Sequence, residues 1–171
     1  MANIYNPTKD EEILTPFSPI LGYKKMSDVF VEKCNKAIDD KMEDWSGNLV
    51  GKVKEELKWN DEIASSWFVR QYEHEYNPIH VHLGSMLSCV GYLQLPEGIE
   101  EEWEEDDKGH HPSHGHIQFV YGHAANHTGS NFLMKPRVGH FIVFPAHLHH
   151  CVYPFKTSGE RRSFSVNFTI A

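Results

Sequence analysis

Eight short apolar runs follow one another from Ser66 onward, and this succession constrains the fold more than any other feature of the chain. The runs are rich in Val, Ile, Phe and Tyr, and Gly, Pro, Asn and Asp separate them. They cover residues 67–72, 79–82, 86–95, 116–121, 132–135, 140–144, 149–153 and 163–170. Strands of this length, with turn residues between them and no long helix interposed, are typical of an all-β sandwich or barrel.

The region before these strands carries the signal of a helix. Within residues 27–44, apolar side chains recur at four-residue steps along one face, namely Phe30, Cys34, Ile38 and Met42. A weaker helical or irregular stretch covers residues 49–57. A chain of 171 residues is the usual size of one domain. We therefore expect a single domain, with an N-terminal helical segment at 1–65 and a β core at 66–171.

The charge balance excludes several classes of protein. The chain has 24 acidic and 16 basic residues, a formal net charge of −8, and no basic cluster that would attract nucleic acid. No apolar stretch approaches the roughly 18 residues of a membrane span, and the first residues lack the order of a signal peptide. The three cysteines are far apart and indicate neither a disulfide framework nor a CxxC metal site. We expect a cytoplasmic protein that binds neither nucleic acid nor membrane.

One segment of low complexity interrupts the strands at residues 97–116. It holds a run of Glu and Asp followed by four histidines: His110, His111, His114 and His116. A block of like charge predicts a solvated, mobile loop. Insertions between strands are common places for lids and substrate-recognition loops, and a negative lid would favour a basic or neutral substrate.

His80 and His82 form the first candidate for chemistry. Residues two apart in a strand point to the same face, so both imidazoles would converge on one side and could share a metal ion. Imidazole suits Fe, Zn, Cu and Ni alike, so the pair alone does not select the metal. A pair of hydrogen-bonded strand histidines without metal is an equally good interpretation of this feature alone.

A third imidazole could come from the segment after Gly139, where a buried strand ends at Pro145 and three histidines follow. Three ligands on an octahedral ion leave positions open, as in mononuclear non-haem iron oxygenases. His147 and His149 would share one face of a strand and His150 would lie on the other. Periodicity therefore does not decide which of the three points inward.

Arg161 opens the last strand and is the third candidate. The alternation is clear there, with Phe, Val and Phe on one face and Ser163, Ser165 and Asn167 on the other, which Arg161 shares. An arginine inside a β-barrel is costly to bury without an anionic partner, and its planar fork matches a carboxylate. Arg161 is thus a candidate clamp for an acidic cosubstrate, against the simpler interpretation of a surface arginine paired with glutamate.

Three blocks, in this order, carry a resemblance to a known family: NPIHVHLGSMLSCVGYL at 77–93, PRVGHFIVFPAHLHHCVYP at 136–154 and RRSFSVN at 161–167. They resemble the Fe(II)- and 2-oxoglutarate-dependent dioxygenases, and more narrowly the small, prolyl-hydroxylase-like 2-oxoglutarate/iron oxygenases of bacteria and phages. The likeness covers residues 66–170. It implies a mostly β fold, a double-stranded β-helix or jelly roll, with the N-terminal helix or helices packed outside and residues 66–171 as the catalytic core.

The resemblance also implies a site. It makes His80, His82 and His150 the metal ligands, with no catalytic residue beyond them. It implies that Arg161 and Tyr92 bind the distal carboxylate of 2-oxoglutarate, with Ser163 and Ser88 beside them. The implied cofactors are Fe(II) and 2-oxoglutarate. The implied reaction is hydroxylation of a C–H bond of an unidentified substrate, either a protein side chain or a small metabolite, with O2 consumed and succinate and CO2 released.

The chain departs from the superfamily pattern at the second ligand. His82 stands where Asp or Glu is usual, so the iron has three His ligands, or His82 lies behind the ligands and water or another carboxylate completes the set. A halogenase-like reaction is a minor alternative. Gly91 and His147 stand where the family usually has Tyr and often has Trp, and they are expected to reshape the substrate side of the pocket.

Two other classes of protein compete with the oxygenase. A non-catalytic cupin-like or β-sandwich module that binds metal or serves a structural role would be expected to follow His-x-His with a Glu, and it gives Arg161 no purpose. A zinc hydrolase also accepts three imidazoles and a water, but it does not explain the arginine. The oligomeric state is left open, with a homodimer as one form, and a phage-encoded protein would act in the host cytoplasm.

Overall fold

Two β-sheets form the body of the computed structural model, which describes residues 4–6, 9–14, 16, 19–40, 55–59, 64–123 and 129–169. The strands are β1 (Ile4–Tyr5), β2 (Glu11–Leu14), β3 (Leu21–Lys25), β4 (Glu55–Trp59), β5 (Ala64–Gln71), β6 (Asn77–His80), β7 (Leu87–Gln94), β8 (Ile117–Val120), β9 (Asn131–Met134), β10 (His140–Pro145), β11 (His149–Val152) and β12 (Arg161–Phe168). The helices are α1 (Asp28–Asp40) and α2 (Ile99–Asp106).

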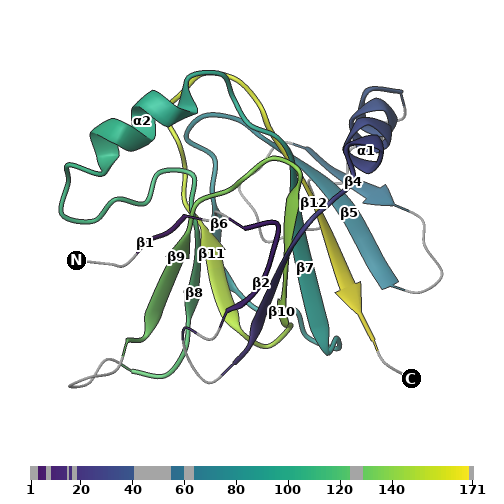
Figure 1. The fold of residues 1–171 in the computed structure, drawn as a ribbon. Coiled ribbons are helices and arrows are strands. Elements are labelled where there is room, and N and C mark those ends of the chain that lie inside the picture. The colour runs from purple at the N-terminus through teal and green to yellow at the C-terminus, as the bar shows by residue number, and fades with distance from the viewer. Residues whose placement is uncertain are drawn as a thin grey trace.

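The strand order is that of a jelly roll. One sheet has the order β1-β9-β8-β11-β6, and the other has the order β2-β3-β10-β7-β12-β5-β4. Each of the eight predicted strands after Ser66 overlaps one of the strands β5 to β12. Figure 1 shows α1 and α2 outside the sheets, on opposite sides of the molecule. The predicted fold class, a mostly β double-stranded β-helix with a helix packed outside, is confirmed.

The two faces of the larger sheet bury different residues. Along β10, Ile142 and Phe144 face the core between the sheets, where they join Tyr92, Phe119 and Leu148. The alternate residues face α1, where the helix contributes a second core with these buried members: Met26, Cys34, Ile38, Phe68, Cys89, Leu93 and Phe164. The period of two that predicts the strands therefore also decides which side chains reach the interior of the jelly roll.

The N-terminal part differs from the expected helical segment at 1–65. The predicted helix at 27–44 is present as α1 over residues 28–40, and residues 41–44 lie outside the described part. Strands β1, β2 and β3 precede it, however, and extend both sheets. In the predicted weak helix at 49–57, the last residues belong to β4, and 49–54 lie outside the described part. These strands are too short to show a clear alternation along the sequence.

The acidic segment at 97–116 was expected to be a loop, and this prediction is wrong for residues 99–106, which form α2. Ile99 and Trp103 lie one turn apart and bury one face against Phe155. The indole N–H of Trp103 donates to the carbonyl oxygen of His114 at 2.8 Å, and His116 is fully buried. Three glutamates lie in the first turn, where the helix dipole favours negative charge.

Gly91 lies on the α1 side of β7 and not on the substrate side of the pocket, so that expectation is also corrected. A Cβ atom added to Gly91 would lie 2.1 Å from a ring carbon of Phe164, which is buried in the second core. We predict that Gly91→Ala lowers the free energy of unfolding by about 1–3 kcal/mol, as overpacking usually does. Urea unfolding would measure the loss. Phe164→Leu should recover part of it in the double variant, and a Gly91→Ala variant of unchanged stability would contradict the close packing.

Candidate metal centre and cosubstrate pocket

Three imidazoles converge between the sheets. His80 ends β6 and is the direct cross-strand partner of His150 on β11. His82 follows β6, and its backbone N–H is held by the carbonyl oxygen of Ala146 at 2.8 Å. The ring centroids lie 4.2 Å apart for His80 and His150, and 5.1 Å apart for the other two pairs. One nitrogen from each ring lies within 4.8 Å of the others, and in the described part of the chain these are the residues that could hold a metal ion.

The hydrogen bonds of two rings select their metal-facing nitrogen. The Nδ1 atom of His80 lies 2.7 Å from the carbonyl oxygen of Pro78, and Nδ1 of His150 lies 2.9 Å from that of Leu148. A carbonyl oxygen only accepts, so each Nδ1 carries the proton and donates it. The lone pair of each ring is therefore on Nε2, the usual arrangement of a histidine ligand whose other nitrogen is fixed by an acceptor.

Burial keeps His82 and His150 neutral. Burial, together with the neighbouring His80, lowers the pKa of His150 to about 3 and the pKa of His82 to about 4. Neutral imidazole is the form that binds a metal. His147 and His149 are both exposed, so of the three candidates that periodicity leaves open, His150 is the one that points inward.

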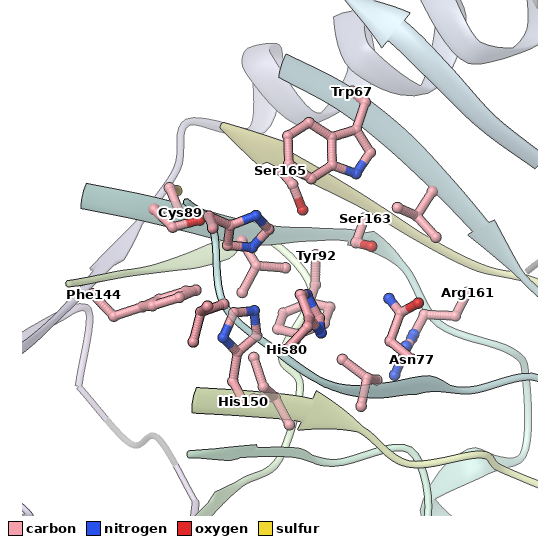
Figure 2. Close-up of a pocket in the computed structure, with 17 residues that line it drawn as sticks. Trp67, Asn77, His80, Cys89, Tyr92, Phe144, His150, Arg161, Ser163 and Ser165 are labelled. Carbon is pink, nitrogen blue, oxygen red and sulfur yellow. The ribbon is translucent and has the colours of Figure 1, made fainter. Parts of the chain in front are cut away.

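The imidazoles open into a cavity of about 120 Å³ that also contains Arg161 (Figure 2). Val152, Ile117 and Phe144 form apolar parts of its wall. No Asp or Glu is among the described residues that line it, and Arg161 is the one Lys or Arg side chain among them. The cavity thus combines three imidazoles that could bind a metal with one fixed positive charge.

Arg161 is buried without a carboxylate partner among the described residues. Its side chain is 2% exposed, and it donates to the carbonyl oxygen of Gly115 at 2.8 Å and to the side-chain oxygen of Gln71. Its Nε atom has no hydrogen-bond partner in the described structure. Burial lowers the pKa of Arg161 to about 10, which still leaves the group positively charged at neutral pH. A buried cation without a counter-ion is a strong site for an anion.

Tyr92 lies beside Arg161 and, like it, has a buried polar atom without a hydrogen-bond partner in the described structure. The guanidinium carbon of Arg161 is 6.0 Å from the centroid of the Tyr92 ring. The Tyr92 hydroxyl is buried and has no hydrogen-bond partner in the described structure, and burial raises its pKa to about 12. Buried polar groups are normally satisfied, so an orphaned hydroxyl next to an orphaned guanidinium nitrogen fits a bound acceptor such as a carboxylate.

The two predicted serines also line the cavity, in different states. Ser163 is the cross-strand neighbour of Tyr92 and lies two residues after Arg161 on the same face of β12. The Ser88 hydroxyl donates to the side-chain oxygen of Asn167 at 2.8 Å. All seven residues predicted from the sequence are therefore gathered at one cavity. Their assigned roles stay predictions.

Several residues of the site carry no prediction from the sequence. They are Trp67, Gln71, Asn77, Ser165 and Asn167. The alternation along β12 places Ser165 and Asn167 on the face of Arg161 but assigns them no role. Asn77 lies in the same block as His80. Trp67 and Gln71 belong to a strand whose alternation says nothing about which polar residues meet a ligand.

The segment at 97–116, which contains α2, supports the Arg161 end of the cavity. Gly115, whose carbonyl accepts from Arg161, has a φ of 69°, and its own N–H donates to the carbonyl oxygen of Pro154 at 2.9 Å. Asp106 on α2 accepts the backbone N–H groups of Ser113 and His114 at 2.6 and 2.8 Å. This segment therefore lies against Arg161. Its helix α2 packs through the small core of Ile99, Trp103 and Phe155.

His116 makes this insertion sensitive to acid. Burial lowers the pKa of His116. The hydrogen bond to the backbone of His114 raises it, but the effect of burial is larger. The folded state thus favours the neutral ring, while the unfolded ring titrates near its ordinary pKa of about 6.5. The stabilising effect is complete above that pH and is lost as the pH falls below it. We predict a lower free energy of unfolding at pH 5.5 than at pH 7.5. His116→Asn should reduce this pH dependence, whereas the exposed control His111→Asn should leave it unchanged.

Together, the jelly roll and the three imidazoles in its interior form a candidate mononuclear metal centre next to a buried arginine. The sequence model of one family, described as "Putative 2OG-Fe(II) oxygenase", matches residues 65–167. The chain belongs to this family, as the resemblance predicts. Its cofactors are accordingly Fe(II) and 2-oxoglutarate, and the donor set fits them: imidazole nitrogens suit iron, and the arginine suits a dicarboxylate.

One solved structure supports the fold. The chain is similar to a non-haem α-ketoglutarate-dependent carbocyclase, SnoK, from nogalamycin biosynthesis, with 10% identity, a TM-score of 0.53, and 85% of this chain and 78% of that chain covered. It also matches a prolyl-4-hydroxylase of Pseudomonas putida at 15% identity, with a TM-score of 0.44 and coverages of 89% and 69%. A 2OG-Fe(II) oxygenase family protein of Burkholderia pseudomallei matches at 14% identity, with a TM-score of 0.45 and coverages of 93% and 72%.

A search of curated proteins gives no match. Neither helix in the described part of the chain has the length and apolar character needed to cross a membrane.

Proposed function

We propose that this protein is a 2-oxoglutarate-dependent dioxygenase that hydroxylates a C–H bond of a substrate held beside the metal. The observation that carries this proposal is the shared cavity. Three imidazoles lie there with a buried arginine that has no carboxylate partner among the described residues. A metal alone would not need the arginine, and an anion alone would not need the imidazoles. The pair of features fits a ligand that is both a chelator and a dianion.

The metal ligands in this proposal are His80, His82 and His150. His80 and His150 would bind through Nε2, because their Nδ1 atoms donate to carbonyl oxygens. Bound Fe(II) and 2-oxoglutarate supply the oxidising chemistry, in which O2 is consumed, succinate and CO2 are released, and one oxygen atom enters the C–H bond of the substrate. The role of the chain is to hold these groups in a fixed geometry away from bulk water.

Arg161 and Tyr92 would bind the distal carboxylate of 2-oxoglutarate. The orphaned Nε atom and hydroxyl supply charge-assisted and neutral hydrogen bonds to it. The hydroxyl of Ser163 lies on the same wall and adds a further donor. Ser88 contributes less directly, because its hydroxyl is already hydrogen-bonded to the side chain of Asn167.

The missing carboxylate gives the centre an unusual charge. Three imidazoles leave the full double charge of Fe(II) uncompensated, and no Asp or Glu lines the described cavity. The dianion of 2-oxoglutarate would neutralise the metal while Arg161 binds its far end. The sequence pattern of the superfamily, with an acidic residue in place of His82, would leave less positive charge for the cosubstrate.

In this proposal the catalytic core spans residues 66–171 of a single domain, and O2, 2-oxoglutarate and one unidentified substrate are its partners. Anaerobic addition of Fe(II) and 2-oxoglutarate should produce a visible charge-transfer band, and subsequent O2 should yield succinate even without substrate. Omitting Fe(II) serves as the control. Wild-type protein that shows neither the band nor succinate, while binding metal, would be a metal-binding module and not an oxygenase.

A further inference from the structure

The third imidazole is held differently from the other two. Nδ1 of His82 faces the side-chain amide of Asn167, whose nitrogen lies at 3.3 Å, and no backbone carbonyl. Asn167 belongs to β12 and is the direct cross-strand partner of Ser88, which donates to its amide oxygen at 2.8 Å. The ring of Trp67 lies against His82, with centroids 5.7 Å apart. A side chain of β12 therefore governs the orientation of this one ring.

The direction of the amide decides what His82 can do. If the amide nitrogen donates to Nδ1, the ring proton is on Nε2, and Nε2 has no lone pair for a metal. An amide can also present its oxygen to the ring and its nitrogen to Ser88, because its two ends have almost the same shape. The Ser88 hydroxyl then accepts. Both contacts persist in this arrangement, and Nδ1 of His82 becomes a donor.

We propose that Asn167 is the positioning residue that makes His82 a metal ligand, by accepting the Nδ1 proton with its amide oxygen. This inference rests on the proposed function, because it takes His82 as the third ligand. All three rings then donate Nδ1–H to an oxygen and present Nε2 to the metal. Two of these oxygens belong to the backbone, at Pro78 and Leu148, and the third belongs to a side chain.

Because the acceptor for His82 is a side chain and not a backbone carbonyl, a substitution at Asn167 can remove it. An acceptor on the second nitrogen of a histidine ligand fixes the ring and raises its basicity, and its loss typically weakens metal binding about 10–100-fold. Asn167→Leu should therefore weaken Co(II) binding by about that factor. Asn167→Asp should bind Co(II) at least as tightly as wild type, because a carboxylate accepts from Nδ1–H but cannot donate to it.

Titration of the visible bands of Co(II) measures these affinities without turnover. Asn131→Asp, an exposed position on β9, is the matched control for an added charge. Asn167→Leu that binds like wild type, or Asn167→Asp that binds as weakly as Asn167→Leu, would overturn the role of Asn167. Wild-type protein that binds no divalent ion would overturn the proposed function as well, so the two failures are distinguishable.

A second measurement on the wild-type protein guards against a variant that does not fold. Nitrogen-15 NMR of the histidine side chains in the Zn(II)-loaded protein reports which ring nitrogen carries the proton. The expected result is a protonated Nδ1 and a metal-bound Nε2 for His80, His82 and His150 alike. A protonated Nε2 on His82 would show that the amide donates to the ring, and the inference would fail.

Discussion

Replacing Arg161 by Met should weaken 2-oxoglutarate binding by about 100-fold or more and leave metal binding intact. A hydrogen bond to a charged group contributes about 1.5–3 kcal/mol, and the buried positive charge opposite the dianion is lost with it, so the total cost is about 3 kcal/mol or more. Arg161 is the one Lys or Arg side chain among the described residues that line the cavity, so no neighbour there replaces its charge. Calorimetric titration of 2-oxoglutarate into the Zn(II)-loaded protein would measure the loss.

The adjacent arginine is a matched control for this experiment. Arg162 points to the other side of the sheet, where it pairs with Glu160 and with Asp39 of α1 at 2.8 Å. Arg162→Met should lower stability and leave the affinity for 2-oxoglutarate unchanged. If Arg161→Met instead loses the metal and retains the cosubstrate, the assigned roles of the arginine and the histidines are wrong.

His150→Ala should abolish tight metal binding, with a loss of about 1000-fold or more. Removing one of three ligands leaves two imidazoles, and bidentate sites seldom compete with water for a divalent ion. His150 has the most buried ring of the three and lies opposite His80 across the β6–β11 pairing. Co(II) titration monitored by visible absorption gives the affinity directly.

His149→Ala is the control for this substitution, because His149 is the neighbouring residue on the exposed face of β11. It should bind Co(II) as the wild type does. Loss of binding in His149→Ala, with His150→Ala unaffected, would mean that the exposed histidines carry the site and that the interior cluster is structural.

Local periodicity explains why much of the jelly roll could be predicted. Along β12 the alternation separates Phe164 from Arg161 and Ser163, and the structure confirms the two faces. The choice of His150 required the resemblance to the family. Burial alternates without a break from Ile142 to His150, so periodicity separates His150 from His147 and His149, but by itself it does not say which of the two faces points inward.

The contacts that support the site could not be predicted, because they join distant parts of the chain. Arg161 contacts Gly115 and Gln71, and His82 contacts Asn167. No local pattern relates such pairs. Helix α2 was missed for a related reason: only Ile99 and Trp103 mark its buried face, and their partner Phe155 lies beyond four further strands.

The pairing of His80 with His150 connects metal binding to the stability of the fold. The two residues lie on neighbouring strands whose connection runs through β7, β8, β9 and β10, so a metal ion bound by both would close a long loop of the chain. The paired histidines exist only in the folded chain. A metal ion that binds them therefore shifts the folding equilibrium toward the folded state as its free concentration rises. The fraction of folded protein should therefore increase with the concentration of free metal ion.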